Sequence, residues 1–375
     1  MKTIYDIQTP CNVAYEEIIN NNISKMQIIA DNFNNNLFPH FKTHKSVYMA
    51  EKQIKAGASG ITVATLEEAE VLVKAGIKKI IIAYPVVGSI KYLKLLNLIS
   101  YADFELTFDS EGQIRKFDEF FSKRTSQKIP FYIKIDVGLN RVGIKLNNSL
   151  YIIVDKLVSG LKTLFFTGFL SHSGKVYSCN NIDCVKNEAI IEFNIMKEAR
   201  EKLSASAYKD IKLSLGSTPA IKALAEYPGI DSLRPGNYIY NDGIGIALGV
   251  SSPEDCGFRV ISQVICKRKD TIIIDAGSKS LGLDRGAHSA ELLTGYGFVM
   301  KNIGSNEIDD TMQISRLSEE HGIINFTGKN KLNIGDYVEI IPNHSCYVAN
   351  LKKNFYLVKS VSKNLEVVDC LPVGE

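Results

Sequence analysis

The segment Gly60-Ile-Thr-Val-Ala-Thr-Leu-Glu-Glu-Ala-Glu-Val-Leu-Val-Lys-Ala-Gly-Ile-Lys-Lys-Ile-Ile-Ile-Ala83 contains the pattern that decides the fold. Two short runs rich in β-branched residues, 60–64 and 79–83, predict strands. Between them, apolar residues recur three and four positions apart from Leu66, and this run ends at Gly76, a residue that commonly follows a helix C-terminus. The segment therefore predicts two parallel strands joined by a crossover helix.

The same alternation continues through the first two thirds of the chain. After a helix expected over residues 14–35, it predicts eight strands, at residues 38–42, 60–64, 79–83, 104–108, 131–136, 165–170, 211–215 and 237–240. Eight strands separated by helices favour a closed (β/α)₈ TIM-like barrel in the α/β class. An open doubly wound sheet is the structural alternative.

After Ile244 the pattern changes to short strand-like runs broken by turn residues. These runs lie at residues 259–266, 270–275, 295–300 and 336–341. They predict a second, all-β domain, so we expect a barrel over residues 14–243 and a β-domain over residues 244–375, with residues 1–13 pairing into the latter. A domain beside a barrel would normally line or cover the barrel mouth, because binding sites favour domain interfaces.

Composition excludes several classes of function. The 375 residues are 45% hydrophobic, and 44 basic against 41 acidic side chains give a net charge of +3. Such a balance creates no field that selects nucleic acid or a membrane surface as partner. The N-terminus lacks the apolar core of a signal peptide, which predicts a soluble, cytoplasmic protein. Seven cysteines without a CxxC motif predict reduced thiols rather than a disulfide framework.

In a barrel of this kind, functional groups lie at the C-terminal ends of the strands. Lys42 falls at the end of the first predicted strand, beside apolar positions that would enclose its stem. Desolvation leaves an amine in its uncharged, nucleophilic form, which imine formation with an aldehyde requires. A solvated or salt-bridged lysine is the ordinary alternative. His40, His44 and Lys45 favour the functional reading, because so many basic groups repel one another unless an anion lies among them.

A second candidate site follows the seventh predicted strand. Gly216-Ser-Thr-Pro219 stands where such barrels often hold a phosphate on backbone N–H groups. The same residues also suit a plain helix start, with a capping hydroxyl and a first-turn proline. Arg234-Pro-Gly-Asn237 adds a cation nearby. An imine lysine and a phosphate site on one barrel suggest a phosphorylated aldehyde, and pyridoxal phosphate fits that description.

Seven motifs carry a resemblance to a known family. They are Pro39-His-Phe-Lys-Thr-His-Lys45, Lys134-Ile-Asp-Val-Gly-Leu-Asn-Arg-Val-Gly143, Ser214-Leu-Gly-Ser-Thr-Pro219, Arg234-Pro-Gly-Asn-Tyr238, Asp275-Ala-Gly-Ser-Lys279, Ser318-Glu-Glu-His-Gly322 and Pro342-Asn-His-Ser-Cys346. The chain resembles the D-serine dehydratase and D-threonine aldolase group of alanine-racemase-like pyridoxal phosphate enzymes. The last three motifs are typical of the dehydratase and aldolase branch.

The resemblance implies roles for particular residues. It implies a Schiff base on Lys42, Arg141 near the phenolic oxygen of the cofactor, and His172 close to the pyridine ring. Further cofactor contacts are implied for Tyr177, Ser217, Thr218, Gly236 and Asn237. It also implies a homodimer whose site is completed across subunits.

His344 and Cys346 are candidate metal ligands. They are two positions apart, so on an extended segment both side chains would point to one face. A neutral imidazole and a thiolate suit zinc, although an ordinary packing pair is the alternative. D-serine dehydratases resemble this chain in having His-x-Cys, whereas D-threonine aldolases tend to have Asp in place of Cys and another divalent metal.

The sequence therefore predicts a pyridoxal phosphate- and metal-dependent lyase for β-hydroxy D-amino acids. Conversion of D-serine to pyruvate and ammonia is favoured, with D-threonine aldolase activity close behind. One alternative is an amino-acid racemase, which needs a second base, but residues 271–281 offer no tyrosine for that role. The other is a non-catalytic pyridoxal phosphate carrier, which would lack a β-domain.

Two positions depart from the family pattern. The family usually has Arg where this chain has Phe38, which would alter the entrance or the substrate set. It also usually ends in an aromatic and basic segment, whereas this chain ends Asp369-Cys-Leu-Pro-Val-Gly-Glu375. The second departure bears on the contacts made by the C-terminus.

Overall fold

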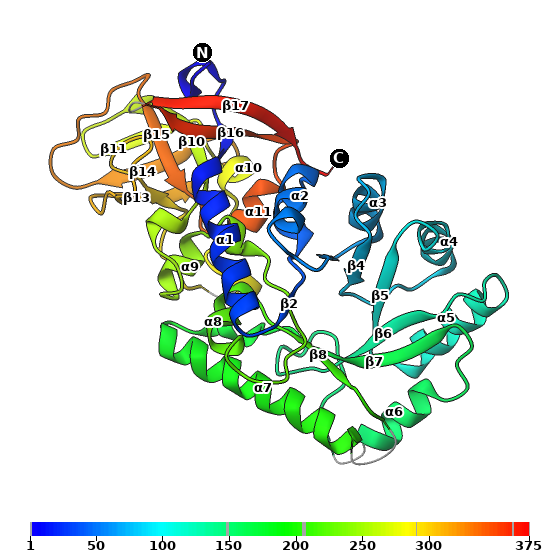
Figure 1. Ribbon diagram of the computed structural model, residues 1–375. Coiled ribbons are helices and arrows are strands. Elements are labelled where there is room, and N and C mark those ends of the chain that lie inside the picture. The colour runs from blue at the N-terminus through cyan, green and yellow to red at the C-terminus, as the bar shows by residue number, and fades with distance from the viewer. Residues whose placement is uncertain (1, 148–149, 205–207, 290, 362–363, 375) are drawn as a thin grey trace.

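The computed structural model describes residues 2–147, 150–204, 208–289, 291–361 and 364–374. Figure 1 shows a parallel sheet surrounded by helices, with a second sheet to one side that contains the first and the last strands of the chain. The α/β prediction is confirmed.

Eight parallel strands build the first sheet. They are β2 (Asn36–Leu37), β3 (Ile61–Val63), β4 (Lys79–Ile82), β5 (Asp103–Phe108), β6 (Ile129–Lys134), β7 (Leu164–Leu170), β8 (Lys212–Leu215) and β9 (Ser232–Leu233). The spatial order is β2-β9-β8-β7-β6-β5-β4-β3. Beyond β2, His40 forms a parallel bridge with Thr62, and the Thr62 N–H donates to the Pro39 carbonyl at 2.8 Å. This contact joins the two ends of the sheet, so the predicted barrel is confirmed over the open alternative.

Helices follow the strands along the outside of the barrel (Figure 1). They are α1 (Glu16–Asn32), α2 (Val47–Lys55), α3 (Leu66–Lys74), α4 (Ser89–Leu98), α5 (Glu111–Ser122), α6 (Leu150–Val158), α7 (Ile182–Ser204), α8 (Ile221–Leu224) and α9 (Gly243–Ala247). In α3, the Thr65 side chain accepts a hydrogen bond from the Glu68 N–H and caps the first turn. Gly76, at φ +84°, lies just beyond its end. The crossover helix predicted from the opening segment therefore forms as expected.

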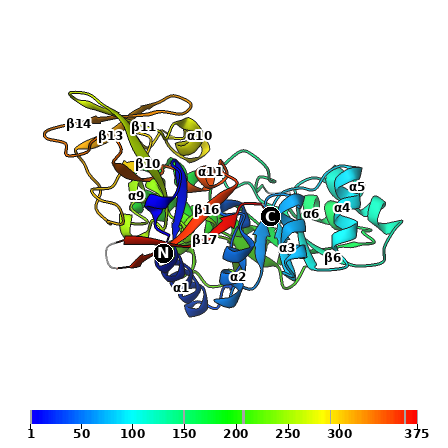
Figure 2. The ribbon, with the colours of Figure 1, turned by 90° about the horizontal axis from the view of Figure 1, so that it is seen from above.

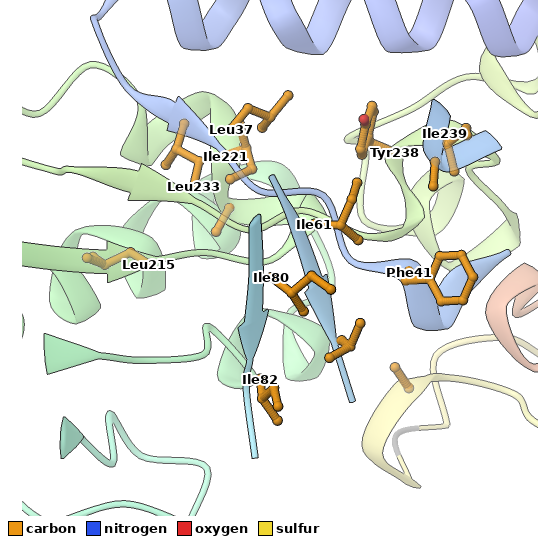
Figure 3. Packing of buried hydrophobic residues seen from close by; sticks show 14 of the residues in the cluster. Leu37, Phe41, Ile61, Ile80, Ile82, Leu215, Ile221, Leu233, Tyr238 and Ile239 are labelled. Atoms are coloured by element: carbon orange, nitrogen blue, oxygen red, sulfur yellow. The ribbon is translucent and has the colours of Figure 1, made fainter. Parts of the chain in front are cut away.

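Side chains of the barrel strands divide into two sets, because neighbours on a strand face opposite sides. Figure 3 shows the set that packs with the helices, including Ile80 and Ile82 of β4. Ile81 of the same strand belongs to a separate buried cluster with Phe38, Tyr132 and Leu170. Phe38 is thus a core residue with 3% of its surface exposed. The expectation that Phe38 affects the entrance is not supported by this placement.

Two predicted strands are wrong in position. The first ends at Leu37, and Lys42 lies in a 3₁₀ helix, Phe41–Thr43. The second, expected at residues 237–240, is a 3₁₀ helix, Asn237–Ile239, and the last barrel strand is β9. Its backbone turns because Thr218 Oγ1 accepts hydrogen bonds from the N–H groups of residues 236 and 238. A contact between distant segments therefore overrides the local strand pattern.

The second sheet is mostly antiparallel and has nine strands among the residues that the structure describes. These are β1 (Cys11–Tyr15), β10 (Phe258–Lys267), β11 (Thr271–Ile274), β12 (Phe298–Val299), β13 (Met312–Leu317), β14 (Gly322–Phe326), β15 (Tyr337–Ile341), β16 (Asn354–Val361) and β17 (Asn364–Pro372). Strand β1 lies between β10 and β16, and pairs in parallel with β16. Short helices α10 (Ser278–Leu281) and α11 (Ser345–Ala349) interrupt the strands. Residues from both ends of the chain thus belong to one sheet.

The described C-terminal residues return to the barrel. Both views show the end of the chain beside α2 (Figures 1 and 2), and the Gly374 N–H donates to the Lys45 carbonyl at 2.7 Å. The atypical C-terminus is therefore in contact with the loop that follows Lys42.

The prediction of reduced thiols is wrong at one pair, because Cys179 and Cys184 form a disulfide. The sequence has no CxxC motif and therefore gave no indication of this pair. The two cysteines are five positions apart, and the turn before α7 brings them together. In the part of the chain that the structure describes, no helix is long and apolar enough to cross a membrane.

Candidate active site

A cavity of about 550 Å³ lies at the C-terminal ends of the barrel strands, against residues from the segments that connect strands of the second sheet. All ten residues proposed from the sequence line it: Lys42, Arg141, His172, Tyr177, Ser217, Thr218, Gly236, Asn237, His344 and Cys346. The barrel strands position the first eight, and the segment after β15 brings in the last two. Residues 304 positions apart at the extremes of this set, Lys42 and Cys346, therefore share one site.

Lys42 is held from two sides. Its N–H donates to His40 Nδ1 at 3.4 Å, and its carbonyl accepts from Asn350 Nδ2 at 3.2 Å. Burial lowers the pKa of the Lys42 amine; Cys346 opposes this shift and the Arg141 guanidinium adds to it. Because a lower pKa increases the uncharged fraction, Lys42 suits bond formation with an aldehyde.

Lys45 differs from Lys42 in its surroundings. It also lines the cavity, but its Nζ lies 3.8 Å from Glu68 Oε1. This ion pair holds the Lys45 amine against a carboxylate on α3. Of the two lysines, Lys42 is therefore the better candidate for the covalent attachment of a cofactor.

Buried cations make the cavity suitable for an anion. Burial, together with Arg141 and Arg234, lowers the pKa of Lys134 to about 8. Burial also lowers the pKa of Arg234 to about 10, and Glu192 opposes that shift. Cations that repel one another in this way are stabilised by a negatively charged ligand.

The segment after β8 has the features of a phosphate cradle. Thr218 Oγ1 already accepts two backbone N–H groups, so the Thr218 hydroxyl proton remains free to donate to a ligand. Ser217 Oγ donates to the Ser173 carbonyl at 3.2 Å. A Cβ placed on Gly236 would lie 2.9 Å from Thr43 Oγ1. The cavity wall is therefore closely packed at Gly236, and the absence of a side chain leaves the backbone accessible to a ligand. These features are compatible with a bound phosphate group.

The Asn237 side chain also connects the barrel with the second domain. Its Nδ2 donates to Asp242 Oδ2 at 2.7 Å, and its Oδ1 accepts from Ser345 Oγ at 2.5 Å. These bonds tie the barrel to the first turn of α11. The Asn237 side chain therefore positions the segment that bears His344 and Cys346.

His172 has an unpartnered polar atom. Its Nε2 is buried and makes no hydrogen bond among the described groups. Burial, Lys42 and Arg141 hold the pKa of His172 well below its usual range, so the ring is neutral. Burial also raises the pKa of the neighbouring Tyr177 hydroxyl. An orphaned atom beside the proposed ring site is consistent with a ligand that completes its bonding.

His344 and Cys346 come together at the start of α11. His344 is the N-cap residue and Cys346 lies in the first turn, so the expected extended segment is wrong, although both side chains still line the cavity. His344 Nδ1 lies 2.8 Å from Asp284 Oδ2, which leaves Nε2 available as a ligand atom. Burial acts to lower the pKa of His344, but hydrogen bonds with Asp284 and Cys346 raise it to about 10. A carboxylate behind a histidine is a common arrangement at metal sites.

The described residues contain no cluster of three or more His, Cys, Asp and Glu side chains that could hold a metal ion. His344 and Cys346 alone are too few for a closed structural zinc site, which has four ligands. An ion at this pair would keep positions open for water or substrate.

Two of the recognised motifs lie away from the cavity. Lys279 contacts Glu319 and Glu320 at 2.8 Å and 2.9 Å, and the Ser278 N–H donates to the Ser318 carbonyl. None of these residues lines the cavity. This pair of motifs therefore stabilises the β-domain.

Sequence reasoning missed Asp284 and His288. Asp284 has no local signal, because its partner is 60 positions away. His288, which also lines the cavity, is the one of the six histidines that neither lies in the seven motifs nor has a role implied by the resemblance. The fact that no motif and no implied role accounted for this histidine was the sequence feature that could have identified it.

Comparison with known proteins agrees with this geometry. The family model described as alanine racemase, N-terminal domain, matches residues 16–243, and the model described as putative serine dehydratase domain matches residues 257–358. D-serine dehydratase of Dictyostelium discoideum is 28% identical over 95% of both chains. D-threonine aldolase of Arthrobacter sp. is 24% identical over 90% of this chain and 86% of that one.

The solved structure of D-threo-3-hydroxyaspartate dehydratase from Delftia sp. HT23 has a TM-score of 0.90 and 27% identity. The alignment covers 100% of this chain and 99% of that chain. A mutant of the same enzyme has been solved in a metal-free form. The likeness extends over both the barrel and the second sheet.

Proposed function

The chain belongs to the alanine racemase N-terminal domain family, and on that premise we propose that it is a pyridoxal phosphate- and metal-dependent lyase acting on β-hydroxy D-amino acids. Elimination from D-serine, which yields pyruvate and ammonia, is the reaction that we favour. One observation carries the proposal: Lys42, a cradle for an anion and the His344–Cys346 pair face a single cavity.

Each wall of the cavity has a part in the proposed reaction. Ser217, Thr218 and the backbone at Gly236 bind the phosphate group. Arg141 and His172 contact the ring, and Lys42 forms the covalent link to the aldehyde. When bound, pyridoxal phosphate supplies a conjugated ring that stabilises negative charge at the substrate α-carbon.

Lys42 also serves as the general base. The lowered pKa of the Lys42 amine would keep a larger fraction of it uncharged and able to accept the α-proton of the substrate. Burial of the amine supports this role, because a fully solvated lysine would be protonated.

His344 Nε2 and Cys346 Sγ would hold zinc or another divalent ion. Such an ion polarises the β-hydroxyl group as a Lewis acid and makes it a better leaving group. Asp284 fixes the orientation of the His344 ring. The Cys ligand is the feature that favours dehydration, since the resemblance associates Asp at this position with aldolases.

D-threonine aldolase activity is the second candidate, and a relative of that name supports it. The two reactions differ in the bond that breaks. Loss of the hydroxyl group gives a keto acid, whereas loss of the hydroxyl proton with cleavage of the Cα–Cβ bond gives glycine and an aldehyde. A racemase is disfavoured because residues 271–281 offer no tyrosine as second base.

The experiment is to load the purified protein with pyridoxal phosphate and zinc, and to supply D-serine and D-threonine separately. Keto acid from D-serine supports the dehydratase, and glycine with acetaldehyde from D-threonine supports the aldolase. Appearance of the L-isomer instead would support the racemase alternative. A yellow protein that alters neither substrate would favour the non-catalytic carrier.

The proposal includes three further predictions. These are a division into a barrel over residues 14–243 and a β-domain over residues 244–375, a homodimer, and a cytoplasmic location. Limited proteolysis tests the first, and sedimentation of the holoprotein tests the second.

A further inference from the structure

His288 approaches the cavity from the second domain. It lies in the short segment between α10 and β12, and its backbone is in the left-handed region at φ 54° and ψ 38°. Residues other than glycine adopt this conformation uncommonly, although histidine does so more often than most. A histidine that keeps it beside a cavity is a candidate functional residue.

The imidazole ring packs between two residues of the proposed cofactor site. Its centroid lies 5.7 Å from that of His172 and 5.3 Å from that of Tyr177, both in edge-to-face geometry. His288 itself is exposed, whereas His172 and Tyr177 are partly buried. His288 lines the cavity and is the most exposed of these three rings.

The two ring nitrogens of His288 make no hydrogen bond with any group that the structure describes. Although His288 is exposed at the surface, partial desolvation of its ring beside the cavity lowers its pKa, and Arg141 and Lys42 add to this effect. A neutral imidazole offers one donor and one acceptor. A hydroxyl group is also both donor and acceptor, whereas a carboxylate only accepts and would be served better by the cations Arg141 and Lys45.

The position of His288 also points to the β-carbon side of a substrate. His344, a candidate ligand of the metal that would act on the β-hydroxyl, lines the same cavity as His288. Asp284, which contacts His344, belongs to the same segment as His288. The segment between α10 and β12 thus contributes both Asp284, which contacts the candidate metal ligand, and His288, which lies against the proposed cofactor site.

We propose that His288 hydrogen-bonds the β-hydroxyl group of the substrate and thereby selects β-hydroxy D-amino acids, an inference that rests on the proposed function. The interaction orients the hydroxyl oxygen toward the metal and requires no transfer of a proton to or from the ring. No proposed phosphate contact involves His288, and a variant that keeps an aromatic ring at this position preserves the packing against His172 and Tyr177.

The test compares two substrates that differ only in the leaving group. D-serine carries a hydroxyl group, and β-chloro-D-alanine carries a chlorine atom that needs no hydrogen-bonding partner to leave. In His288→Phe, which keeps an aromatic ring against His172 and Tyr177, we expect kcat/KM for D-serine to fall by about tenfold or more. The value for β-chloro-D-alanine should change by less than about threefold.

Two further variants separate the ring from the backbone. His288→Asn tolerates the left-handed conformation and retains hydrogen-bonding groups, so it should recover part of the D-serine activity. Any strain that Phe introduces affects both substrates equally and cancels in their ratio. Glu291→Gln removes the ion pair with Arg285 in the same segment and serves as a control outside the cavity.

Equal losses with both substrates in His288→Phe would overturn the proposal, as would an unchanged D-serine value. If the wild-type protein converts neither D-serine nor D-threonine, the proposed function fails on its own. The role of His288 is then judged from equilibrium binding, which is monitored by the absorbance of the cofactor. Tighter binding of D-serine than of D-alanine, lost in His288→Phe, supports it, and an equal preference in both proteins refutes it.

Discussion

Substitution of Gly236 by alanine tests the proposed phosphate cradle. An added Cβ would lie 2.9 Å from Thr43 Oγ1 and 3.2 Å from His40 Cβ, so at least the threonine must move. Gly236 has φ −116°, a value that alanine adopts without strain, so the substitution acts through crowding alone. Crowding by one carbon in a packed site costs about 1–3 kcal/mol.

This cost should fall on cofactor binding rather than on folding. Thr43 and His40 both line the cavity, so they have room to shift while it holds no ligand. A bound cofactor removes that room. Since about 1.4 kcal/mol corresponds to a tenfold change in Kd, we expect the affinity for pyridoxal phosphate to fall by roughly five- to 150-fold.

The assay is a titration of the cofactor-free protein with pyridoxal phosphate, followed by the absorbance of the cofactor because the chain has no tryptophan. Gly112→Ala is the matched control, since a Cβ at that position on α5 meets no atom within 4 Å. The melting temperature of the cofactor-free Gly236→Ala protein should stay close to that of the control. An unchanged Kd would refute the placement of the phosphate beside Gly236, and a large loss of stability without cofactor would refute the argument that Thr43 and His40 can relax.

Three further predictions concern the cofactor and the metal. Reduction with borohydride should fix pyridoxal phosphate to the peptide that contains Lys42, and labelling of Lys45 instead would contradict the assignment. Replacing both Ser217 and Thr218 by alanine should weaken cofactor affinity by about 1–3 kcal/mol, the usual cost of lost hydrogen bonds to a charged group; the same titration measures it, and no change would place the phosphate elsewhere. A chelator should abolish turnover of D-serine while the melting temperature and the cofactor absorbance stay nearly unchanged, and added zinc should restore activity. The Cys346→Ala protein should lose activity in the same way and remain folded. Unfolding on chelation would indicate a structural ion. Turnover that survives both treatments would show that His344 and Cys346 are only a packing pair.

The local pattern of the chain was sufficient for the architecture. Alternating strand and helix periodicity specified the barrel, because each unit buries one apolar face against its neighbours in sequence. Ten of the residues that line the cavity were also found from the sequence, since barrels place function at strand ends and the motifs mark those ends. Lys42, Ser217 and Thr218 all lie on the cavity wall as expected.

Tertiary structure decided the features that depend on contacts between distant segments. The turn at Asn237 forms because Thr218 binds its backbone, and the 3₁₀ helix at Lys42 is held by Asn350 from the second domain. The contact of Asp284 with His344, and of His288 with His172, joins residues that no local pattern relates. Local sequence encodes which faces are apolar and which turns are possible, but the orientation of a side chain in a site depends on neighbours that only the folded chain brings within reach.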